Sequence, residues 1–406
     1  MLVKSSTELV RQQNSALVLA SLRRHGPLAH TDISHHTGLA SATVSAITAE
    51  LEKAEVLERR EQQAAASRGR PRVIFGQRRG AGYLIAVRIS SDLVQYSLAD
   101  YGGTLIDRFE EARNHADSST RPFAEAFVAA LDRLAERSRI GRDEVLIVSI
   151  SSKGLVDPAS ARLVWSPVFG AEQVDFAALL QPHWRAKILL SNETLLVAHA
   201  MALRMVKVGA ENLAAVATLS LGHSIGLGIA RFDRTGGLSV TAPNFGHMLN
   251  SSDGKLCRCG AQGCIEASAG FYGILRTAFE VPPDTIPAKF VPLAEMDKIA
   301  LRARQGHRMS EYAFRQAGLA LGQGLSRMVS LYESMPIVIT GPGTRYFDLL
   351  QRGLEEGLGQ SQQVRLFGAP PITVAPEEAT LVLEGHLDRA LSEMDHDIIA
   401  ARTDGG

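Results

Sequence analysis

Hydrophobic positions in the first part of the chain recur at helical spacing in three consecutive segments. The first segment runs from Ser6 to Arg24, and the following His25-Gly26-Pro27 predicts that the helix stops there. A short helix is expected from about His30 to Thr37, closed by Gly38, and a longer one from Ser41 to about Lys53. The apolar residues on one face of the third helix are Val44, Ile47 and Leu51. This order of helices, with a glycine in the turn, is typical of a helix-turn-helix.

The third helix begins with small polar side chains on the face opposite its apolar residues. They are Ser41, Thr43 and Ser45, which can hydrogen-bond base edges or contact a thymine methyl group in a major groove. Ala40 stands where an N-cap serine is expected, which costs the helix ~1 kcal/mol. We therefore expect this helix to read double-stranded DNA. The alternative from the pattern alone is an ordinary three-helix bundle.

Two short alternating runs, Val56–Arg60 and Arg72–Phe75, predict a hairpin after the helices. The connection between them ends in Arg68-Gly69-Arg70-Pro71, which is narrow, cationic and extended. Such a tip suits insertion into a narrow minor groove, so Arg68 and Arg70 are expected to contact DNA. As a charge run alone it would be only a solvated loop. Helices and hairpin together predict a winged helix-turn-helix domain over residues 1–80.

From residue 81 onward, strand-like and helix-like segments alternate along the chain. Strands are expected within 82–99 and at 145–150, 188–190, 214–221, 226–231 and 337–340, and helices at 122–137 and 195–205. This alternation predicts an α/β body over residues 81–406, in which helices cover central sheets. No internal sequence repeat is visible in the body.

The charge of the chain follows the same division. Residues 1–80 contain 12 Lys and Arg against 7 Asp and Glu, whereas the remainder contains 31 against 36. A basic N-terminal part on an acidic body favours a polyanion as the partner of the head. No apolar run approaches the ~18 residues of a membrane span, and the N-terminus lacks the apolar region of a signal peptide. We therefore expect a soluble cytoplasmic protein with no membrane partner.

All three cysteines of the chain lie in one stretch, at Cys257, Cys259 and Cys264, and His247 precedes them. Three thiolates and one imidazole form a complete tetrahedral ligand set for Zn²⁺. Because protein fills all four positions, we expect one structural zinc ion per chain with no catalytic role. The odd, clustered cysteines argue against a disulfide framework and for a reducing compartment. The alternatives are three unrelated free thiols, or one disulfide with a cysteine left over.

The same stretch carries a family signature. A Gly-His pair at 246–247, followed by C-x-C-G-x-x-G-C-x-E at 257–266, resembles the signature of the ROK family of repressors, uncharacterised frames and sugar kinases. The helix-turn-helix and its wing resemble the head of ROK repressors along their whole length. The resemblance of the body is equally extensive and implies the two-lobed, actin-like ATPase fold.

The resemblance also implies a pocket for a sugar-like effector. The positions that correspond to the family's sugar contacts are Asn192, Glu193, Asn244, His247 and Glu266. However, Asn244 replaces an acid, Glu193 replaces an aspartate, and Val168 stands where an asparagine is usual. A pocket that has lost polar partners rejects its former ligand, so either a different ligand binds or the pocket is vestigial. In the second case Asn192, Glu193 and Glu266 would only satisfy one another and the backbone.

The segments with which a ROK kinase approaches ATP are altered in this chain. The replaced positions of the two phosphate turns are Arg88, Ser90, Ser91, Asp92, His223 and Ser224. Side chains at glycine positions keep backbone N–H groups away from phosphate, and Asp92 adds repulsion. Glu193, at the position of the catalytic base, misplaces its carboxylate by about 1 Å, which alone can cost ~10²-fold in rate. We therefore expect no catalytic residue and no enzyme activity.

Head and body together predict a DNA-binding transcriptional regulator, a repressor of carbohydrate-related genes that acts as a homodimer or homotetramer. Its partners are expected to be operator DNA and a sugar-like effector, whose binding would change the spacing of the heads. Two other functions stay open from the sequence. One is an ATP-dependent sugar kinase, and the other is a DNA-binding protein whose body only dimerises.

Overall fold

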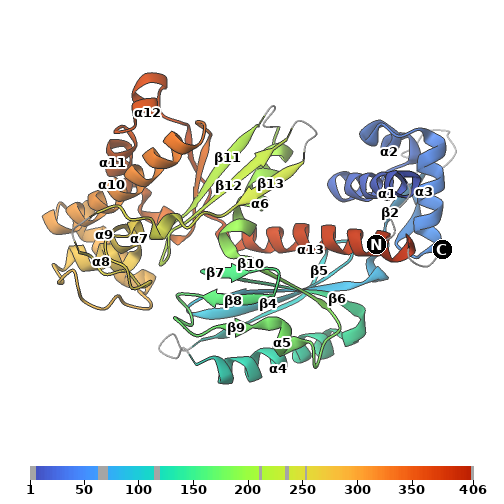
Figure 1. Ribbon diagram of the computed structural model, residues 1–406, viewed down its shortest axis with the longest axis horizontal. Coiled ribbons are helices and arrows are strands. Elements are labelled where there is room, and N and C mark those ends of the chain that lie inside the picture. Colours follow the sequence, from blue (N-terminus) through green and yellow to red (C-terminus); the bar gives the residue numbers. More distant parts are fainter. Residues whose placement is uncertain are drawn as a thin grey trace.

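A computed structural model describes residues 6–62, 72–113, 119–209, 213–233, 237–251 and 254–403 of the chain. A small head lies at one end of the molecule, and two lobes form the body (Figure 1). In the described part of the chain, no helix has the length and apolar character that a membrane crossing needs.

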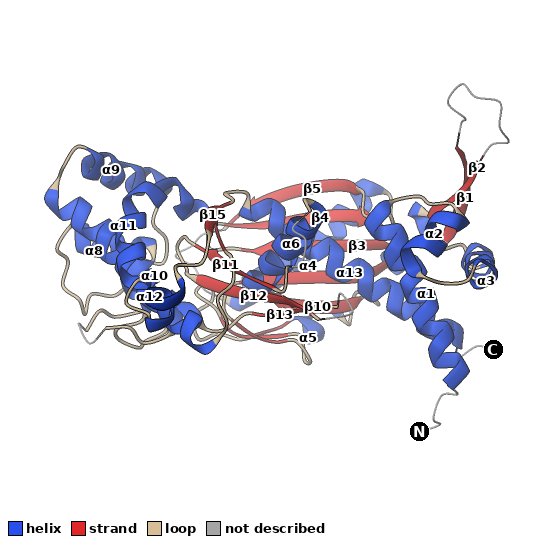
Figure 2. Ribbon diagram, turned by 90° about the horizontal axis from the view of Figure 1, so that it is seen from above, coloured by secondary structure: helices blue, strands red, loops and turns tan. Residues whose placement is uncertain are grey.

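The head is a winged helix-turn-helix, which confirms the prediction. Its elements are α1 (Ser6–His25), α2 (His30–Thr37), α3 (Ser41–Lys53), β1 (Leu57–Gln62) and β2 (Arg72–Gln77). The apolar face expected for α3 is buried, with Val44, Ile47 and Leu51 at most 4% exposed. β1 and β2 pair antiparallel and project from the end of the molecule (Figure 2). The boundary expected near residue 80 lies in a 3₁₀ turn, η1 (Arg79–Ala81).

Lobe I, residues 83–192, is built on a five-stranded sheet in the order β10-β6-β3-β4-β5. Its elements are β3 (Tyr83–Ile89), β4 (Leu93–Asp100), β5 (Leu105–Ala112), α4 (Thr120–Ser138), η2 (Arg142–Glu144), β6 (Val145–Ser152), β7 (Leu155–Asp157), β8 (Arg162–Trp165), β9 (Val174–Asp175), α5 (Phe176–Leu180) and β10 (Lys187–Asn192). Phe127 and Leu131 of α4 pack against the sheet in one apolar core. The short strands β7, β8 and β9 form a separate small sheet that the sequence pattern does not reveal.

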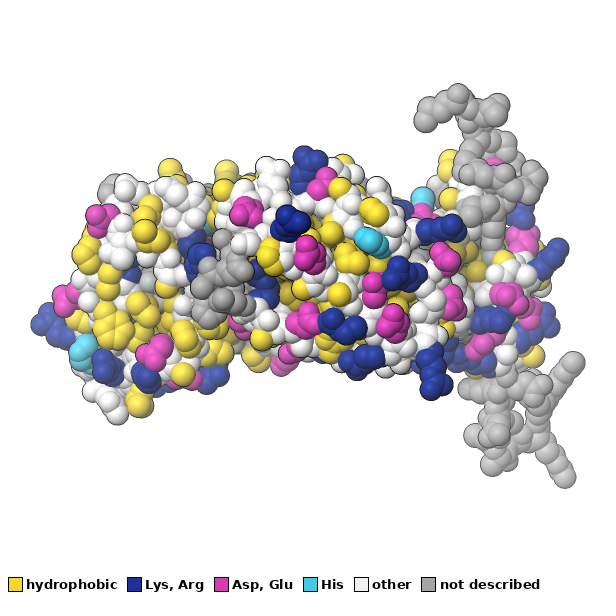
Figure 3. Space-filling view, turned by 90° about the horizontal axis from the view of Figure 1, so that it is seen from below, with side chains coloured by type: hydrophobic (Ala, Val, Ile, Leu, Met, Phe, Trp, Pro, Cys, Tyr) yellow, Lys and Arg dark blue, Asp and Glu magenta, His cyan; other side chains and the backbone are white. Residues whose placement is uncertain are grey.

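Lobe II, residues 213–374, carries a second five-stranded sheet and most of the remaining helices. Its elements are β11 (Ala215–Ser220), β12 (Gly226–Phe232), β13 (Leu238–Thr241), η3 (Phe245–His247), α7 (Ile265–Ala269), α8 (Phe271–Ala278), α9 (Leu293–Arg304), α10 (Arg308–Leu331), β14 (Ile337–Thr340), η4 (Pro342–Tyr346), α11 (Phe347–Leu358), α12 (Gln362–Phe367) and β15 (Ile372–Val374). In the space-filling view, charges of both signs mix over the middle of the molecule, and apolar side chains gather at the lobe II end (Figure 3).

The two sheets share one topology although the sequence shows no repeat. The second sheet runs in the order β13-β12-β11-β14-β15. In each sheet the first three strands form an antiparallel meander. The fourth strand, β6 or β14, pairs in parallel with the first, and the fifth, β10 or β15, pairs in parallel with the fourth. The body is therefore a structural duplication, which confirms the α/β, two-lobed prediction.

Two helices lie between the lobes: α6 (Glu193–Lys207) and the C-terminal α13 (Glu378–Thr403). Figure 1 shows α13 running from the middle of the body toward the head. At its far end Leu391 and Met394 share an apolar cluster with Leu22 of α1. Asp395 accepts hydrogen bonds from Arg23 of α1 through both carboxylate oxygens, and Tyr101 donates to it as well. The C-terminal helix thus fixes the head to lobe I.

Candidate functional site

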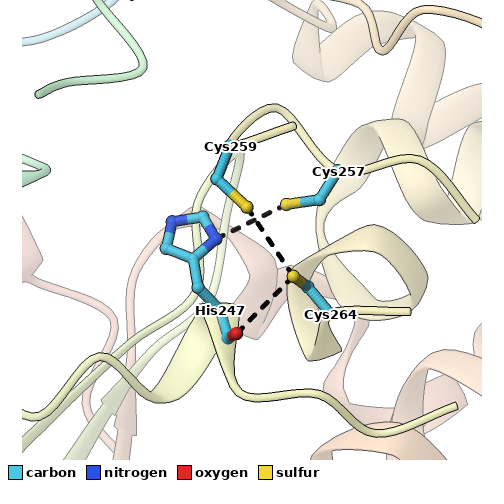
Figure 4. A group of neighbouring side chains, drawn as sticks. All are labelled: His247, Cys257, Cys259 and Cys264. Atoms are coloured by element: carbon cyan, nitrogen blue, oxygen red, sulfur yellow. Dashed lines mark hydrogen bonds between the residues drawn. The ribbon is translucent and has the colours of Figure 1, made fainter. Parts of the chain in front are cut away.

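The four residues expected to bind a metal ion converge in lobe II. His247 ends η3, Cys257 and Cys259 lie on the loop that follows, and Cys264 is the N-cap of α7. The Sγ atoms of Cys259 and Cys264 are 3.7 Å apart, and Cys257 Sγ is 3.4 Å from His247 Nδ1. All four ligand atoms lie within 4.8 Å of one another. Figure 4 shows them around one point, with the other ring nitrogen of His247 turned away.

These distances fit one metal ion held by four ligands. Tetrahedral zinc with Zn–S bonds of ~2.3 Å and a Zn–N bond of ~2.0 Å places sulfurs about 3.8 Å apart and sulfur and nitrogen about 3.6 Å apart. All three thiols are free, so none is spent in a disulfide. Burial raises the pKa of the Cys264 thiol, and so do the neighbouring Cys257 and Cys259. Three crowded thiolates need a cation between them, and the cluster can therefore hold a metal ion.

The chain bends sharply to bring Cys264 back toward Cys257. Gly263 lies in the left-handed region at φ +79°, and a Cβ atom there would stand 1.8 Å from the carbonyl oxygen of Ser251. Only glycine fits such a position. Beside the cluster, the Tyr272 hydroxyl lies 3.4 Å from Cys257 Sγ and supports it from the core of lobe II. Neighbours of this kind orient the ligands of a metal site.

A small cavity lies beside His247, between the lobes. Four of the five expected effector residues line it: Asn192, Asn244, His247 and Glu266. Its volume is about 70 Å³, below the ~300 Å³ at which small-molecule pockets begin. Asn244 is exposed there, on the lobe II side. Asn192, on the lobe I side, donates from Nδ2 to the Gly154 carbonyl at 2.6 Å and caps α6 through Oδ1.

Glu266 is buried and fully engaged within lobe II. Its carboxylate lies 3.2 Å from Arg258 Nη2 and accepts a hydrogen bond from the Ile225 N–H at 3.2 Å. Arg258 also stacks over the Tyr272 ring, with its Cζ 4.9 Å from the ring centroid. The acid expected to bind a hydroxyl group is therefore fixed in place by Arg258, a residue of the metal loop.

Glu193, the fifth expected effector residue, is not among the residues that line this cavity. Arg88 donates to both of its carboxylate oxygens, at 2.9 and 3.0 Å, and Lys153 lies 3.5 Å from it. Burial would raise the pKa of Glu193, but the charges of Arg88 and Lys153 outweigh it and lower the pKa to about 2. The sequence marked Arg88 and Glu193 as two separate replacements, whereas the structure joins them in one buried ion pair.

A second acid, Glu378, completes this cluster at the base of the interlobe cleft. It lies 3.5 Å from Arg88 and 3.9 Å from Lys153, and it accepts a hydrogen bond from Ser220 of lobe II. Two cations and two carboxylates from β3, the turn after β6, α6 and α13 therefore meet at one point. We call Arg88, Lys153, Glu193 and Glu378 the ionic cluster. Asn192, Glu193 and Glu266 do have partners, but not one another.

The replaced phosphate turns lie together around a larger cavity of about 450 Å³. The expected residues that line it are Arg88, Ser90, Ser91, Asp92, Val168, His223 and Ser224. His223 Nε2 donates a hydrogen bond to the Val291 carbonyl oxygen at 2.8 Å, and burial lowers the pKa of His223 to about 4. This cavity adjoins the smaller one, since both are lined by Lys153 and Ser224.

The DNA-binding residues expected in the head are accessible where the structure describes them. Ser41 and Ser45 are exposed on α3, and Thr43 is half-buried. Ala40 makes no side-chain cap, and the first turn of α3 holds no acidic residue that would repel phosphate. Arg68 and Arg70 lie outside the described residues. The helix-turn-helix thus leaves the expected face of α3 open to a partner.

Sequence reasoning missed three contributors to the site: Lys153, Arg258 and Glu378. Lys153 and Glu378 act over long sequence separations, so no local pattern marks them. Arg258 stands between two of the metal-binding cysteines, and its place in the metal loop was the one available signal. Lys153 and Arg258 are partners of acids that the sequence did single out, and Glu378 is a second partner of Arg88.

A winged-helix head joined to a two-lobed body, with one histidine and three cysteines clustered beside an interlobe pocket, defines a regulator-like relative of the actin-like kinases. The chain belongs to the ROK family, whose sequence profile matches residues 94–375. The profile of the MarR family matches residues 12–63, within the head. The family expected from the sequence is therefore confirmed.

Curated relatives and solved structures match along most of the chain. The DNA-binding transcriptional repressor Mlc of Escherichia coli is 23% identical over 357 residues, 86% of each chain. A xylose repressor of Caldicellulosiruptor bescii is 23% identical and covers 95% of this chain and 97% of its own. The crystal structure of a ROK family transcriptional regulator, a homolog of E. coli Mlc, superposes with a TM-score of 0.73 at 19% identity, covering 98% of this chain and all of the other. A ROK family glucokinase from Streptomyces griseus, in complex with glucose, gives 0.54 at 22% identity, covering 76% and 99%.

Proposed function

We propose that this protein is a DNA-binding transcriptional regulator, a repressor of carbohydrate-related genes that responds to a sugar-like effector. The observation that carries the proposal is the combination of an open recognition helix with a kinase-like body in which the carboxylate of Glu193 is taken up by the ionic cluster. The names of the relatives agree with it, since they are repressors, two of them named for xylose and N-acetylglucosamine.

The ionic cluster argues against phosphoryl transfer by this chain. A general base works best when its pKa lies near the operating pH, whereas the pKa of Glu193 is held at about 2. Arg88 donates hydrogen bonds to both carboxylate oxygens of Glu193, so a substrate hydroxyl group can reach this carboxylate only by breaking a buried ion pair. We therefore do not infer sugar phosphorylation by this chain from the fold that it shares with the glucokinase.

The metal cluster is proposed to hold one structural Zn²⁺ ion. Three thiolates and an imidazole are ligands that zinc prefers, and a site with four protein ligands has no open position for catalysis. Bound there, zinc would fix His247 through Nδ1, so that its other ring nitrogen is presented to the cavity. The metal would thus position one wall of the effector pocket.

The protein is further proposed to act in the cytoplasm as a homodimer or homotetramer. A two-fold pair of heads contacts two half-sites of an operator, one or more helical turns apart. Exposed apolar side chains on lobe II give such self-association a surface; they include Ile286, Leu331 and Phe367.

DNA binding is tested with duplexes selected from a random pool by the purified chain. Ser45→Glu places a negative charge on the exposed face of α3 and should weaken binding at least ~10-fold. The matched control is Ser239→Glu, at an exposed position of the edge strand β13 in lobe II, which should leave binding unchanged. Arg68 and Arg70 both changed to Ala should flatten the slope of log K against log salt by up to ~2. A chain that selects no duplex would refute the proposal.

The two other functions are separated by two further measurements. Sugar-dependent ATP turnover above background would identify a kinase instead. A thermal-shift screen with sugars tests the effector, since a ligand at 100 times its Kd adds ~2.7 kcal/mol of stability. DNA binding without any such ligand would leave a body that serves only for self-association.

A further inference from the structure

The small cavity beside His247 has one large aromatic wall that none of the expected contacts includes. Trp165 is the last residue of β8 in lobe I, and its indole lines the cavity opposite Asn244 and His247 of lobe II. The Trp165 and His247 rings lie 5.2 Å apart, centroid to centroid, with planes at 86°. This contact crosses from one lobe to the other at the mouth of the proposed effector pocket.

The backbone of Trp165 is held rigidly on the lobe I side. Trp165 pairs with Leu155 across β7 and β8. Its carbonyl oxygen would stand 2.1 Å from a Cβ atom on Gly154, where φ is +129°, so only glycine permits this approach. The Gly154 carbonyl in turn accepts the hydrogen bond of Asn192. Trp165 and Asn192 are therefore parts of one wall.

The side chain of Trp165 is less restrained than those of His247, Glu266 and Asn192 in the same lining. His247 is tied to the metal cluster, and Glu266 and Asn192 are engaged by hydrogen bonds. Phe245, the other aromatic residue of the lining, is 5% exposed and belongs to the lobe II core. The Trp165 indole is half-buried and lies outside the apolar cores of both lobes. It is the wall that a ligand can contact or displace.

An indole next to a ring of polar groups matches the chemistry of a cyclic sugar. Its hydroxyl groups form hydrogen bonds around the edge of the ring, and its C–H bonds form an apolar face that packs on an aromatic plane. The cavity of about 70 Å³ is too small for such a ring while Trp165 contacts His247. Binding must therefore displace the indole from His247, a contact that joins the two lobes.

We propose that Trp165 is the specificity-determining residue of the effector pocket: its indole packs on the apolar face of a cyclic sugar, which takes the place of the contact with His247. This inference rests on the proposed function, because it assumes a sugar-like effector. It adds which residue selects the sugar ring, and which contact between the lobes the ring displaces.

Fluorescence can follow Trp165 directly, since the chain contains two tryptophans. The other, Trp184, is 2% exposed in the core of lobe I. In a Trp184→Phe variant, titration with glucose, xylose and N-acetylglucosamine should shift the emission of Trp165 for the sugar that binds. Sorbitol, an open-chain polyol with hydroxyl groups but no ring face, should give no shift.

Calorimetric titration then measures the contribution of the indole to affinity. Trp165→Ala should weaken binding of that sugar about tenfold or more, which corresponds to ~1.4 kcal/mol, and Trp165→Phe should retain most of it. Metal content and melting temperature of both variants report that the lobes are intact. Equal sugar affinity of the wild type and Trp165→Ala would overturn this inference and leave the proposed function standing. If the wild type binds no sugar, the effector part of the proposed function fails, and this inference fails with it.

Discussion

At the scale of single residues, the functional carboxylates of the body are occupied by guanidinium groups of the same chain. Arg88 holds Glu193, and Arg258 holds Glu266. Both pairs are nearly buried, so each charge has exchanged water for one specific partner. A buried pair contributes little net stability, but the loss of one partner leaves an uncompensated charge. The two arginines therefore limit which other groups these carboxylates can bind.

Arg88→Leu should destabilise the protein by about 3–5 kcal/mol, because it leaves Glu193 buried without its main partner. Urea unfolding measures the effect. The matched control is Arg304→Leu: Arg304 binds Asp348 in a similar two-oxygen geometry, but the side chains are 45% and 55% exposed. Its loss should cost less than ~1 kcal/mol. Equal effects of the two variants would contradict a buried ion pair at Arg88.

Cys259→Ser should release the proposed zinc ion and lower stability, because one of four ligands is lost. Metal analysis of the purified protein should give one zinc per wild-type chain and a large deficit in the variant. Chelation should lower the melting temperature of the wild type, and the variant should no longer respond to it. Full zinc content and unchanged melting in Cys259→Ser would refute the assignment.

The metal ligands were predictable from the sequence because loop spacing places them close together. The ionic cluster was not, since Arg88 and Glu193 are 105 positions apart. Arg88 at a replaced position of a phosphate turn, and Glu193 in place of an aspartate, look in the sequence like two independent losses. Only the fold shows that each compensates the other, as a cation and an anion in the same buried place.

At the scale of elements, the helix α13 makes contacts with several separate parts of the molecule. Its 26 residues span about 39 Å at ~1.5 Å per residue. Glu378 at its start belongs to the ionic cluster, His386 in its middle bridges Ser149 and Ser151 of β6, and Asp395 binds the head. One helix therefore contacts the cleft, the central sheet of lobe I and α1.

Stability should fall as the pH falls below 6.5, in part because of His386. Burial lowers its native pKa from 6.5 to about 3, with Arg88, Arg389 and Glu193 as the charged groups nearby. Between these values the unfolded chain binds the extra proton, so stability rises with pH. Urea unfolding of His386→Gln should show a pH slope smaller by up to ~1.4 kcal/mol per unit between pH 6.5 and 5. Identical slopes would mean that His386 is not neutral in the folded protein.

The elements of the head could be predicted because their signals are local: glycine turns, short apolar periods and an alternating hairpin. The helix α13 escaped notice for a physical reason. His386 and Asp395 are polar yet buried, at 1% and 6% exposure, because each has a partner elsewhere in the chain. Their polar character interrupts the apolar period that would mark a helix. The strands β7 to β9 are simply too short to carry a period.

At the scale of the whole molecule, α13 gives a mechanical connection between pocket and head. A ligand shifts the arrangement of the lobes only by as much as it binds one arrangement better than the other. A cyclic sugar that separates Trp165 from His247 would bind the more open arrangement. The start of α13 is linked to both lobes through Arg88 and Ser220, so its orientation depends on that arrangement.

Glu378→Gln should therefore lower DNA affinity, because it loosens the start of α13 in the absence of a ligand. Coupling energies of 1–3 kcal/mol correspond to ~5–150-fold, and we expect at least the lower value. Titration with a selected duplex measures it. Glu377→Gln is the control, since Glu377 is the exposed neighbour on the same turn. The same DNA affinity in both variants would show that the cleft and head are not coupled through this helix.

The duplicated topology of the body was beyond the reach of the sequence. Equivalent strands such as β3 and β11 share their neighbours and directions, but not their residues. Either strand is a buried apolar run, and many different sequences satisfy that requirement equally well. Two halves of a fold can therefore keep the same strand order and directions when their sequences no longer resemble each other.

The bond between Arg23 and Asp395 joins two distant parts of the chain. The acid that anchors α1 lies 372 positions after the arginine that it binds. A chain that ends before Asp395 would contain the helices of the head without the contact that holds them against the body. In such a truncated product, the position of the head would no longer depend on the arrangement of the lobes.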